Sequence, residues 1–186
     1  MREVAIGILI FAFSASTCAQ ESMRQVDWKN FTYPLSGPRL GHDRLEWLDT
    51  SKVGHLELVN GRGAPDSPGF TFKSVKFADV TSDGKEDAVV VVHLNTGGTQ
   101  QTDYVYIYSF APGKPRLLAY FHSGDRGTSG LHDVYGEDGK LVVELYDPKK
   151  RSGDCCSSGF VRTRYKWQNG RFETSGAREA VSLPEP

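Results

Sequence analysis

The sequence lacks any excess of charge of one sign, any late hydrophobic run of membrane length, and the short motifs of the common enzyme classes. Its 22 Lys and Arg residues balance 23 Asp and Glu residues, so we expect no general attraction to nucleic acid or to an anionic membrane. Beyond residues 4–13, no stretch approaches the roughly 18 apolar residues that a membrane helix needs. HExxH, GxSxG, P-loop and CxxC patterns are missing too, so no motif indicates a class of enzymatic reaction.

Residues 1–19 predict a signal peptide. A short charged start precedes the apolar run at 4–13, and small polar residues follow it, which is the order typical of a secretory signal. We expect cleavage after Ala19 and export to the periplasm or the medium. Cys18 leaves a second interpretation open, because a bacterial lipoprotein signal ends in a cysteine that is acylated and anchors the protein.

The rest of the chain has the composition of one globular domain. Apolar residues make up 38% and aromatic residues 11% of the sequence, which is enough for a hydrophobic core. Residues 20–29 are polar and aperiodic, and they predict a flexible leader. We place the domain at residues 30–176 and a tail at 177–186.

Short β-rich runs separated by turn residues predict an all-β domain. Two pairs of runs flank Asp138-Gly139 and Asn169-Gly170, dipeptides that favour tight hairpins. The valines at 89–92 have no polar alternation, which indicates a central strand covered on both faces. We expect seven to nine mostly antiparallel, meandering strands in a curved sheet, sandwich or barrel. The runs from residue 70 onward are 70–79, 88–94, 104–110, 117–121, 131–135, 141–146, 160–167 and 171–174.

Residues 79–87 have the oxygen spacing of a calcium loop, with a glycine at the sixth position. The missing acidic residue at the twelfth position excludes an EF-hand, and the loop resembles the Asp-rich loops of FG-GAP and integrin-type β-propeller repeats. This pattern predicts weak Ca²⁺ binding. A tight turn, in which side chains bond backbone amides and Gly84 takes a positive φ, explains the same residues. The candidate metal residues are Asp79, Thr81, Asp83, Lys85 and Asp87.

Several short motifs in a fixed order resemble a wider group of proteins. They are Asn-Phe-Thr-Tyr-Pro at 30–34, the loop at 79–88, Gly-Asp-Arg at 124–126, the adjacent pair Cys155-Cys156, and the segment 165–170 that ends in Asn-Gly. In this order they resemble uncharacterised bacterial secreted proteins and lipoproteins, including the mycobacterial LppP/LprE type. The resemblance implies an exported envelope protein, and it brings no catalytic residue because that family has no established activity.

Tyr104, Tyr106 and Tyr108 form a candidate ligand-binding stripe. Their spacing places all three side chains on one face of a strand. Such a stripe stacks on the sugar rings of a glycan when it is exposed, or it belongs to the core, where each hydroxyl needs one partner. Burial of these rings separates the two interpretations.

An enzymatic function would depend on four residues, which are His122, Asp125, His132 and Asp133. Imidazole and carboxylate groups close together form a general base or bind zinc, whereas polar residues at turns and strand edges give the same pattern. Our first hypothesis is therefore an exported, non-enzymatic protein that binds a ligand or an envelope component. The alternative is a secreted hydrolase.

Cys155 and Cys156 are the two cysteines that remain when residues 1–19 are removed. In an oxidising compartment they pair with each other, pair between molecules, or stay free. Adjacent Cα atoms lie about 3.8 Å apart, closer than the roughly 4.4 to 6.8 Å of ordinary disulfides. We predict a strained vicinal disulfide within one chain.

Overall fold

The structure is a computed structural model that describes residues 22–40, 54–98, 101–111, 113–125, 129–152 and 156–184. For 151, 152 and 156 it describes the backbone alone. The predicted signal peptide and Cys155 lie outside the described residues, and so does the side chain of Cys156.

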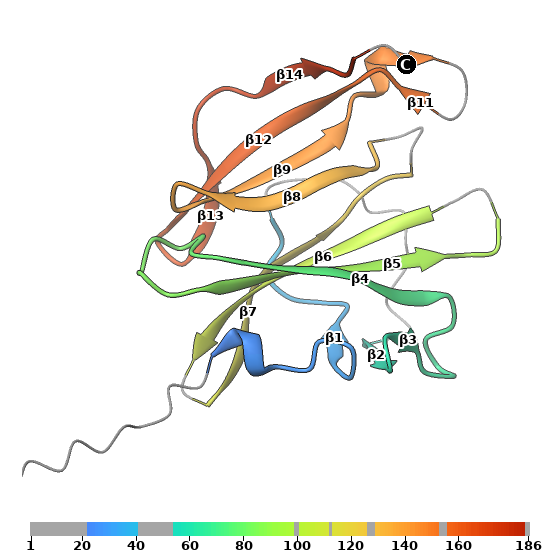
Figure 1. Cartoon of the computed structure of the whole chain (residues 1–186), viewed down its shortest axis with the longest axis vertical. Helices are drawn as coiled ribbons and strands as arrows, with labels where there is room; N and C mark the ends of the chain where they lie inside the picture. The colour runs from blue at the N-terminus through green and yellow to red at the C-terminus, as the bar shows by residue number, and fades with distance from the viewer. Residues whose placement is uncertain are drawn as a thin grey trace, which may run out of the picture.

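Two antiparallel sheets form a two-layered all-β fold (Figure 1), as the sequence predicts. The first sheet pairs its strands in chain order: β1 (Thr32–Pro34), β2 (His55–Val59), β3 (Arg62–Gly63), β4 (Phe70–Ala78), β5 (Asp87–Asn95), β6 (Gln101–Ala111) and β7 (Lys114–His122). The second contains β8 (Leu131–Glu137), β9 (Lys140–Tyr146), β12 (Gly159–Gln168), β13 (Arg171–Thr174) and β14 (Glu179–Ser182). Shorter elements are β10 (Arg151–Ser152), β11 (Cys156–Ser157) and the 3₁₀ turns η1 (Met23–Gln25) and η3 (Pro148–Lys150).

The two predicted hairpin turns are confirmed by their backbone angles. Asp138 and Gly139 have φ values of 50° and 69°, and Asn169 and Gly170 have 53° and 79°. Positive φ at both central residues is the requirement of the tight turn whose twist matches the flanking strands. These turns join β8 to β9 and β12 to β13 in antiparallel register.

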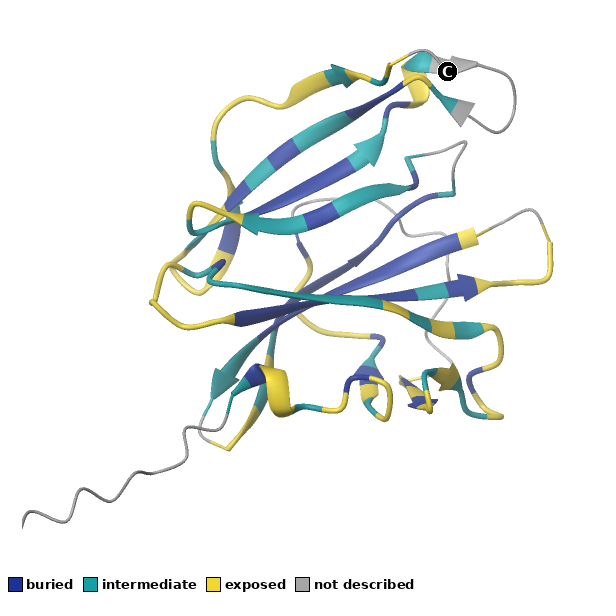
Figure 2. Cartoon of the chain, in the orientation of Figure 1, coloured by how far each residue is buried: buried dark blue, intermediate teal, exposed yellow. Residues whose placement is uncertain are grey.

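β5 is the central strand that its valines predict. It lies between β4 and β6, and Val89 to Val92 are all buried. Val90 and Val92 belong to a first core beneath the first sheet, whereas Val89 and Val91 belong to a second core between the two sheets. Figure 2 shows the continuous buried band along β5 and β6 that results.

The predicted leader is wrong for residues 22–29, which are part of the domain. Met23 and Trp28 are buried in the first core, and the Trp28 indole N–H donates to the Met23 carbonyl at 3.2 Å. Arg24 pairs with Glu86 at 2.6 Å. Two large apolar side chains anchor this polar segment without producing any period that the sequence could reveal.

The predicted tail is also wrong, because residues 179–182 form β14. This strand pairs with β12, with Ser182 opposite Gly159 and Glu179 opposite Arg162. Glu179 accepts a hydrogen bond from Arg164 at 2.5 Å. The strand is short and mostly exposed, so its sequence resembles that of a tail.

The sheets approach most closely where β4 meets β8. A methyl group at Gly136 would lie 2.4 Å from the Cβ atom of Ala78, so only glycine fits at this contact. A pocket lies between β7 of the first sheet and the β9–β12 pair of the second.

Candidate functional site

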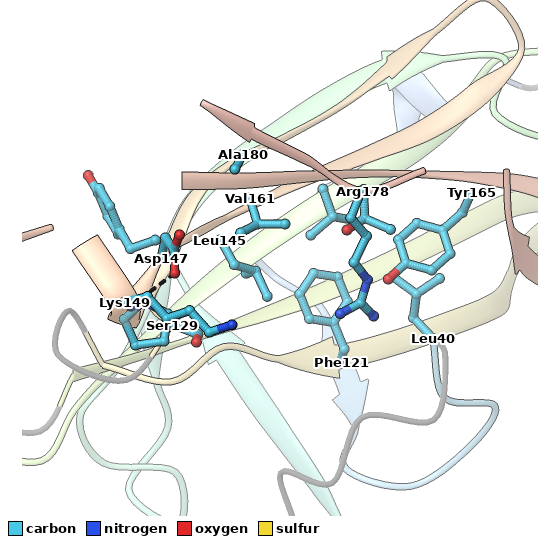
Figure 3. A pocket seen from close by; sticks show the side chains of 14 residues that line it. Leu40, Phe121, Ser129, Leu145, Asp147, Lys149, Val161, Tyr165, Arg178 and Ala180 are labelled. Carbon is cyan, nitrogen blue, oxygen red and sulfur yellow. Dashed lines mark hydrogen bonds between the residues drawn. The ribbon is translucent and has the colours of Figure 1, made fainter. Parts of the chain in front are cut away.

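A pocket of about 520 Å³ lies between the two sheets. This volume lies within the range of small-molecule sites. Its apolar wall takes Phe121 from β7, Val143 and Leu145 from β9, and Val161 from β12 (Figure 3). The other lining residues are Leu40, Ser129, Tyr146, Asp147, Pro148, Lys149, Thr163, Tyr165, Arg178 and Ala180.

Charged groups lie at the rim of this pocket. Arg178 comes from the connection between β13 and β14, and Lys149 comes from η3. Asp147 is buried, and its carboxylate accepts the backbone N–H of Lys149 at 2.9 Å, the contact drawn in Figure 3. The one acidic side chain of the described lining therefore accepts a hydrogen bond within its own turn.

A second polar cluster lies on the outer face of the second sheet. The Glu144 carboxylate is buried and accepts from His132 Nδ1 at 3.0 Å, Tyr135 at 3.1 Å and Arg162 at 2.7 Å. The His132 ring stacks on Phe160 with centroids 4.3 Å apart. This cluster joins β8, β9 and β12, and no sequence pattern predicts Glu144 as its centre.

The tyrosine stripe, defined as Tyr104, Tyr106 and Tyr108, lies in the first core. All three residues are at most 3% exposed. Trp28 covers Tyr108 at a centroid distance of 5.2 Å, and Tyr33 covers Tyr106 at 4.9 Å. Of the two interpretations of the stripe, the core is confirmed, and the ligand-binding surface is wrong because no face of these rings is exposed to a glycan.

The stripe hydroxyls have no hydrogen-bond partner among the described residues, whereas two neighbouring tyrosines do have one. Tyr33 donates to the Trp28 carbonyl at 2.5 Å, and Tyr120 donates to the Leu35 carbonyl at 3.0 Å. Burial raises the pKa of Tyr104 to about 12 and raises the pKa of Tyr106 well above its usual value. These phenols therefore stay neutral in the folded protein.

The histidines of the predicted enzyme site belong to different layers. His122 is buried and packs against Tyr104 in the first core, at a centroid distance of 5.6 Å. His132 contacts Glu144 on the outer face of the second sheet, and Asp133 pairs with Lys76. Within the described residues, no group of three or more His, Cys, Asp or Glu side chains could hold a metal ion.

The loop at 79–87 is held by hydrogen bonds to its own amides. Asp79 accepts from the N–H groups of Asp83 at 3.2 Å and Gly84 at 2.8 Å. Asp87 accepts from Val80 at 3.0 Å, and burial raises its pKa, which weakens it as a metal ligand. Gly84 has a φ of 81°, as the turn requires. These contacts make the loop a hydrogen-bonded turn, and calcium binding stays a prediction.

We expect Asp79→Ala to lower the free energy of unfolding by about 1–2 kcal/mol in EDTA, because the loop loses its amide acceptor. Urea unfolding measures this loss. Asp66→Ala is the control, since Asp66 is exposed and makes no side-chain hydrogen bond with a described residue. Millimolar Ca²⁺ tests the metal separately. A rise in melting temperature that Asp83→Ala abolishes would support a calcium site, and an unchanged temperature would leave only the turn.

The predicted disulfide between Cys155 and Cys156 cannot be placed, because it falls on residues and side chains outside the described part of the chain. The backbone of β11, which begins at Cys156, pairs with β10 in a short antiparallel ribbon. This ribbon follows η3, the element that carries Lys149 to the pocket rim.

No helix in the described ranges is long and apolar enough to cross a membrane. No family model matches the chain. The chain is similar to the Holliday junction branch migration complex subunit RuvB of Oenococcus oeni, with 28% identity over 163 residues. That match covers 82% of this chain and 44% of RuvB, so the chain spans less than half of that protein. This likeness does not show that the chain belongs to a family of known function.

Proposed function

We propose that the protein is an exported, non-enzymatic binding protein of the bacterial envelope or its surroundings, whose ligand is a small, largely apolar molecule. The pocket between the sheets carries this proposal, because its volume of about 520 Å³ and its apolar wall suit such a ligand. The order of residues at 1–19 supports export. The balanced charge of the chain gives no support for nucleic-acid binding, so the likeness to RuvB does not change the proposal.

A neutral, environment-sensitive dye such as Nile red tests this proposal. We expect saturable binding of one dye per chain with a rise in fluorescence, because the pocket wall excludes water from an apolar ring system. Val161→Phe, which adds bulk inside the pocket, should weaken this binding about tenfold.

Val59→Phe is the matched control, since Val59 is 49% exposed on β2 and does not line the pocket. It should bind the dye as the natural sequence does. Circular dichroism shows whether each variant is folded, and Leu145→Phe replaces Val161→Phe if that variant unfolds. Absence of saturable binding, or equal binding by the pocket-filling and control variants, would refute the proposal.

A further inference from the structure

The pocket rim carries two cations from separate elements. Arg178 precedes β14 and Lys149 lies in η3, and Figure 3 shows both side chains pointing into the pocket from its two ends. A pocket for a wholly apolar ligand needs no such groups. Apolar walls with a few well-placed polar groups are instead the arrangement that orients a ligand with a polar end.

Arg178 differs from the arginines on the neighbouring strand. Arg162 pairs with Glu144 at 2.7 Å, and Arg164 pairs with Glu179 at 2.5 Å. By contrast, no ion pair or hydrogen bond joins the Arg178 guanidinium to another described residue. Its planar fork of donors remains available for a carboxylate, which it can bind through two parallel hydrogen bonds.

Asp147 is the acidic residue of the lining, and it is held within its own turn. Its carboxylate accepts the Lys149 backbone N–H at 2.9 Å, and its carbonyl accepts the Lys150 N–H at 3.0 Å. The lining therefore carries two positive side chains and one negative side chain, which leaves a net positive charge. Charge complementarity favours an anionic head group above the apolar wall.

We infer that the ligand is an amphiphile with a single carboxylate, whose apolar body lies against Phe121 and Leu145 and whose head group binds Arg178, with Lys149 as the second cation. This inference rests on the proposed function and names the ligand class of the same pocket. Because both cations are exposed and therefore partly screened, the head group adds selectivity while the apolar wall supplies most of the affinity.

Displacement of bound Nile red by dodecanoate and by 1-dodecanol tests the inference, with both used below their aggregation concentrations. These probes share an apolar chain and differ in head-group charge. We expect the natural sequence to favour dodecanoate by about tenfold, and we expect Arg178→Ala to remove that preference while leaving 1-dodecanol binding unchanged. Arg171→Ala is the control, because Arg171 is an exposed arginine on β13 that pairs with Glu173 and does not line the pocket.

The outcomes separate the inference from the proposed function. Equal displacement by both probes would overturn the inference and leave a neutral-ligand pocket, whereas absence of dye binding would refute the proposed function itself. If Arg178→Ala and Lys149→Ala both keep the preference for dodecanoate over 1-dodecanol, these two cations do not bind the head group. If the protein co-sediments with anionic phospholipid vesicles but does not bind dodecanoate, the occupant is a membrane surface and the inference is overturned. If sedimentation velocity shows dimers that bury the pocket, the occupant is a second copy of the chain.

Discussion

Raising the pH from 10 towards 12 is expected to unfold the protein cooperatively. Burial raises the pKa of Tyr33, Tyr104, Tyr106 and Tyr108 above the ordinary value of 10.0. A folded-state pKa that is raised means that the neutral phenol is favoured in the folded protein. The stability that these groups contribute is complete below pH 10, and it is lost as the pH rises further because only the unfolded chain releases the protons.

The expected slope is large. Each tyrosine that ionises only on unfolding lowers the free energy of unfolding by about 1.4 kcal/mol per pH unit, so the four together lower it by about 5.5 kcal/mol per unit. This is comparable with the whole stability of a small domain. Ultraviolet absorbance of tyrosinate and far-ultraviolet circular dichroism, followed together against pH, should change at the same midpoint.

Tyr106→Phe and Tyr33→Phe form a matched pair for this experiment. Each variant should reduce the alkaline slope by about a quarter, since one of four buried phenols is removed. At neutral pH they should differ. Tyr33→Phe loses the hydrogen bond to Trp28 and about 1 kcal/mol, whereas Tyr106→Phe loses a hydroxyl that has no partner among the described residues and should be neutral or stabilising. Gradual titration near pH 10 in a folded chain would contradict the buried stripe.

Glu144→Ala is expected to lower the free energy of unfolding by about 2–3 kcal/mol. Removing one partner of a buried ion pair costs about 3–5 kcal/mol, and the expected loss is smaller here because the His132 and Arg162 side chains are 26% and 27% exposed and regain water. Urea unfolding at neutral pH measures the change. Arg162→Ala in the Glu144→Ala background should cost less than it does alone, because the two residues share one interaction.

Glu137→Ala is the control on the same hairpin. Its carboxylate is 44% exposed and pairs with Arg164 at 3.4 Å, so its loss should cost less than about 1 kcal/mol. If Glu144→Ala and Glu137→Ala destabilise the protein equally, Glu144 is not the centre of the outer-face cluster.

Local sequence patterns predicted the strands well because the residue pattern of a strand depends on which of its faces are buried. The Asn169-Gly170 turn requires only its two residues, and the valines of β5 reveal cover on both faces without naming what covers them. The tyrosine stripe was ambiguous for the same reason. Its cover includes Trp28, some eighty residues earlier in a segment that reads as a polar leader.

The pocket could not be predicted from such patterns. Its wall combines β7, β9 and β12, and each apolar side chain taken alone reads as an ordinary core residue of its strand. Arg178 falls in a segment that reads as a tail, because β14 is defined by its pairing with β12 and not by any alternation of its own. Binding sites between layers depend on contacts that are distant in sequence, and one sequence alone does not record them.

The pairing of neighbouring strands in chain order has a consequence for how the molecule is assembled. In the first sheet every strand pairs with the next strand of the chain, so these contacts close short loops and can form early in folding. β12 pairs with β9 along one edge, but its other edge is covered only when β13 and β14 follow. The wall that carries Phe121 can thus form first, and Arg178 arrives just before the final strand, so the binding pocket is the last part of the molecule to be completed.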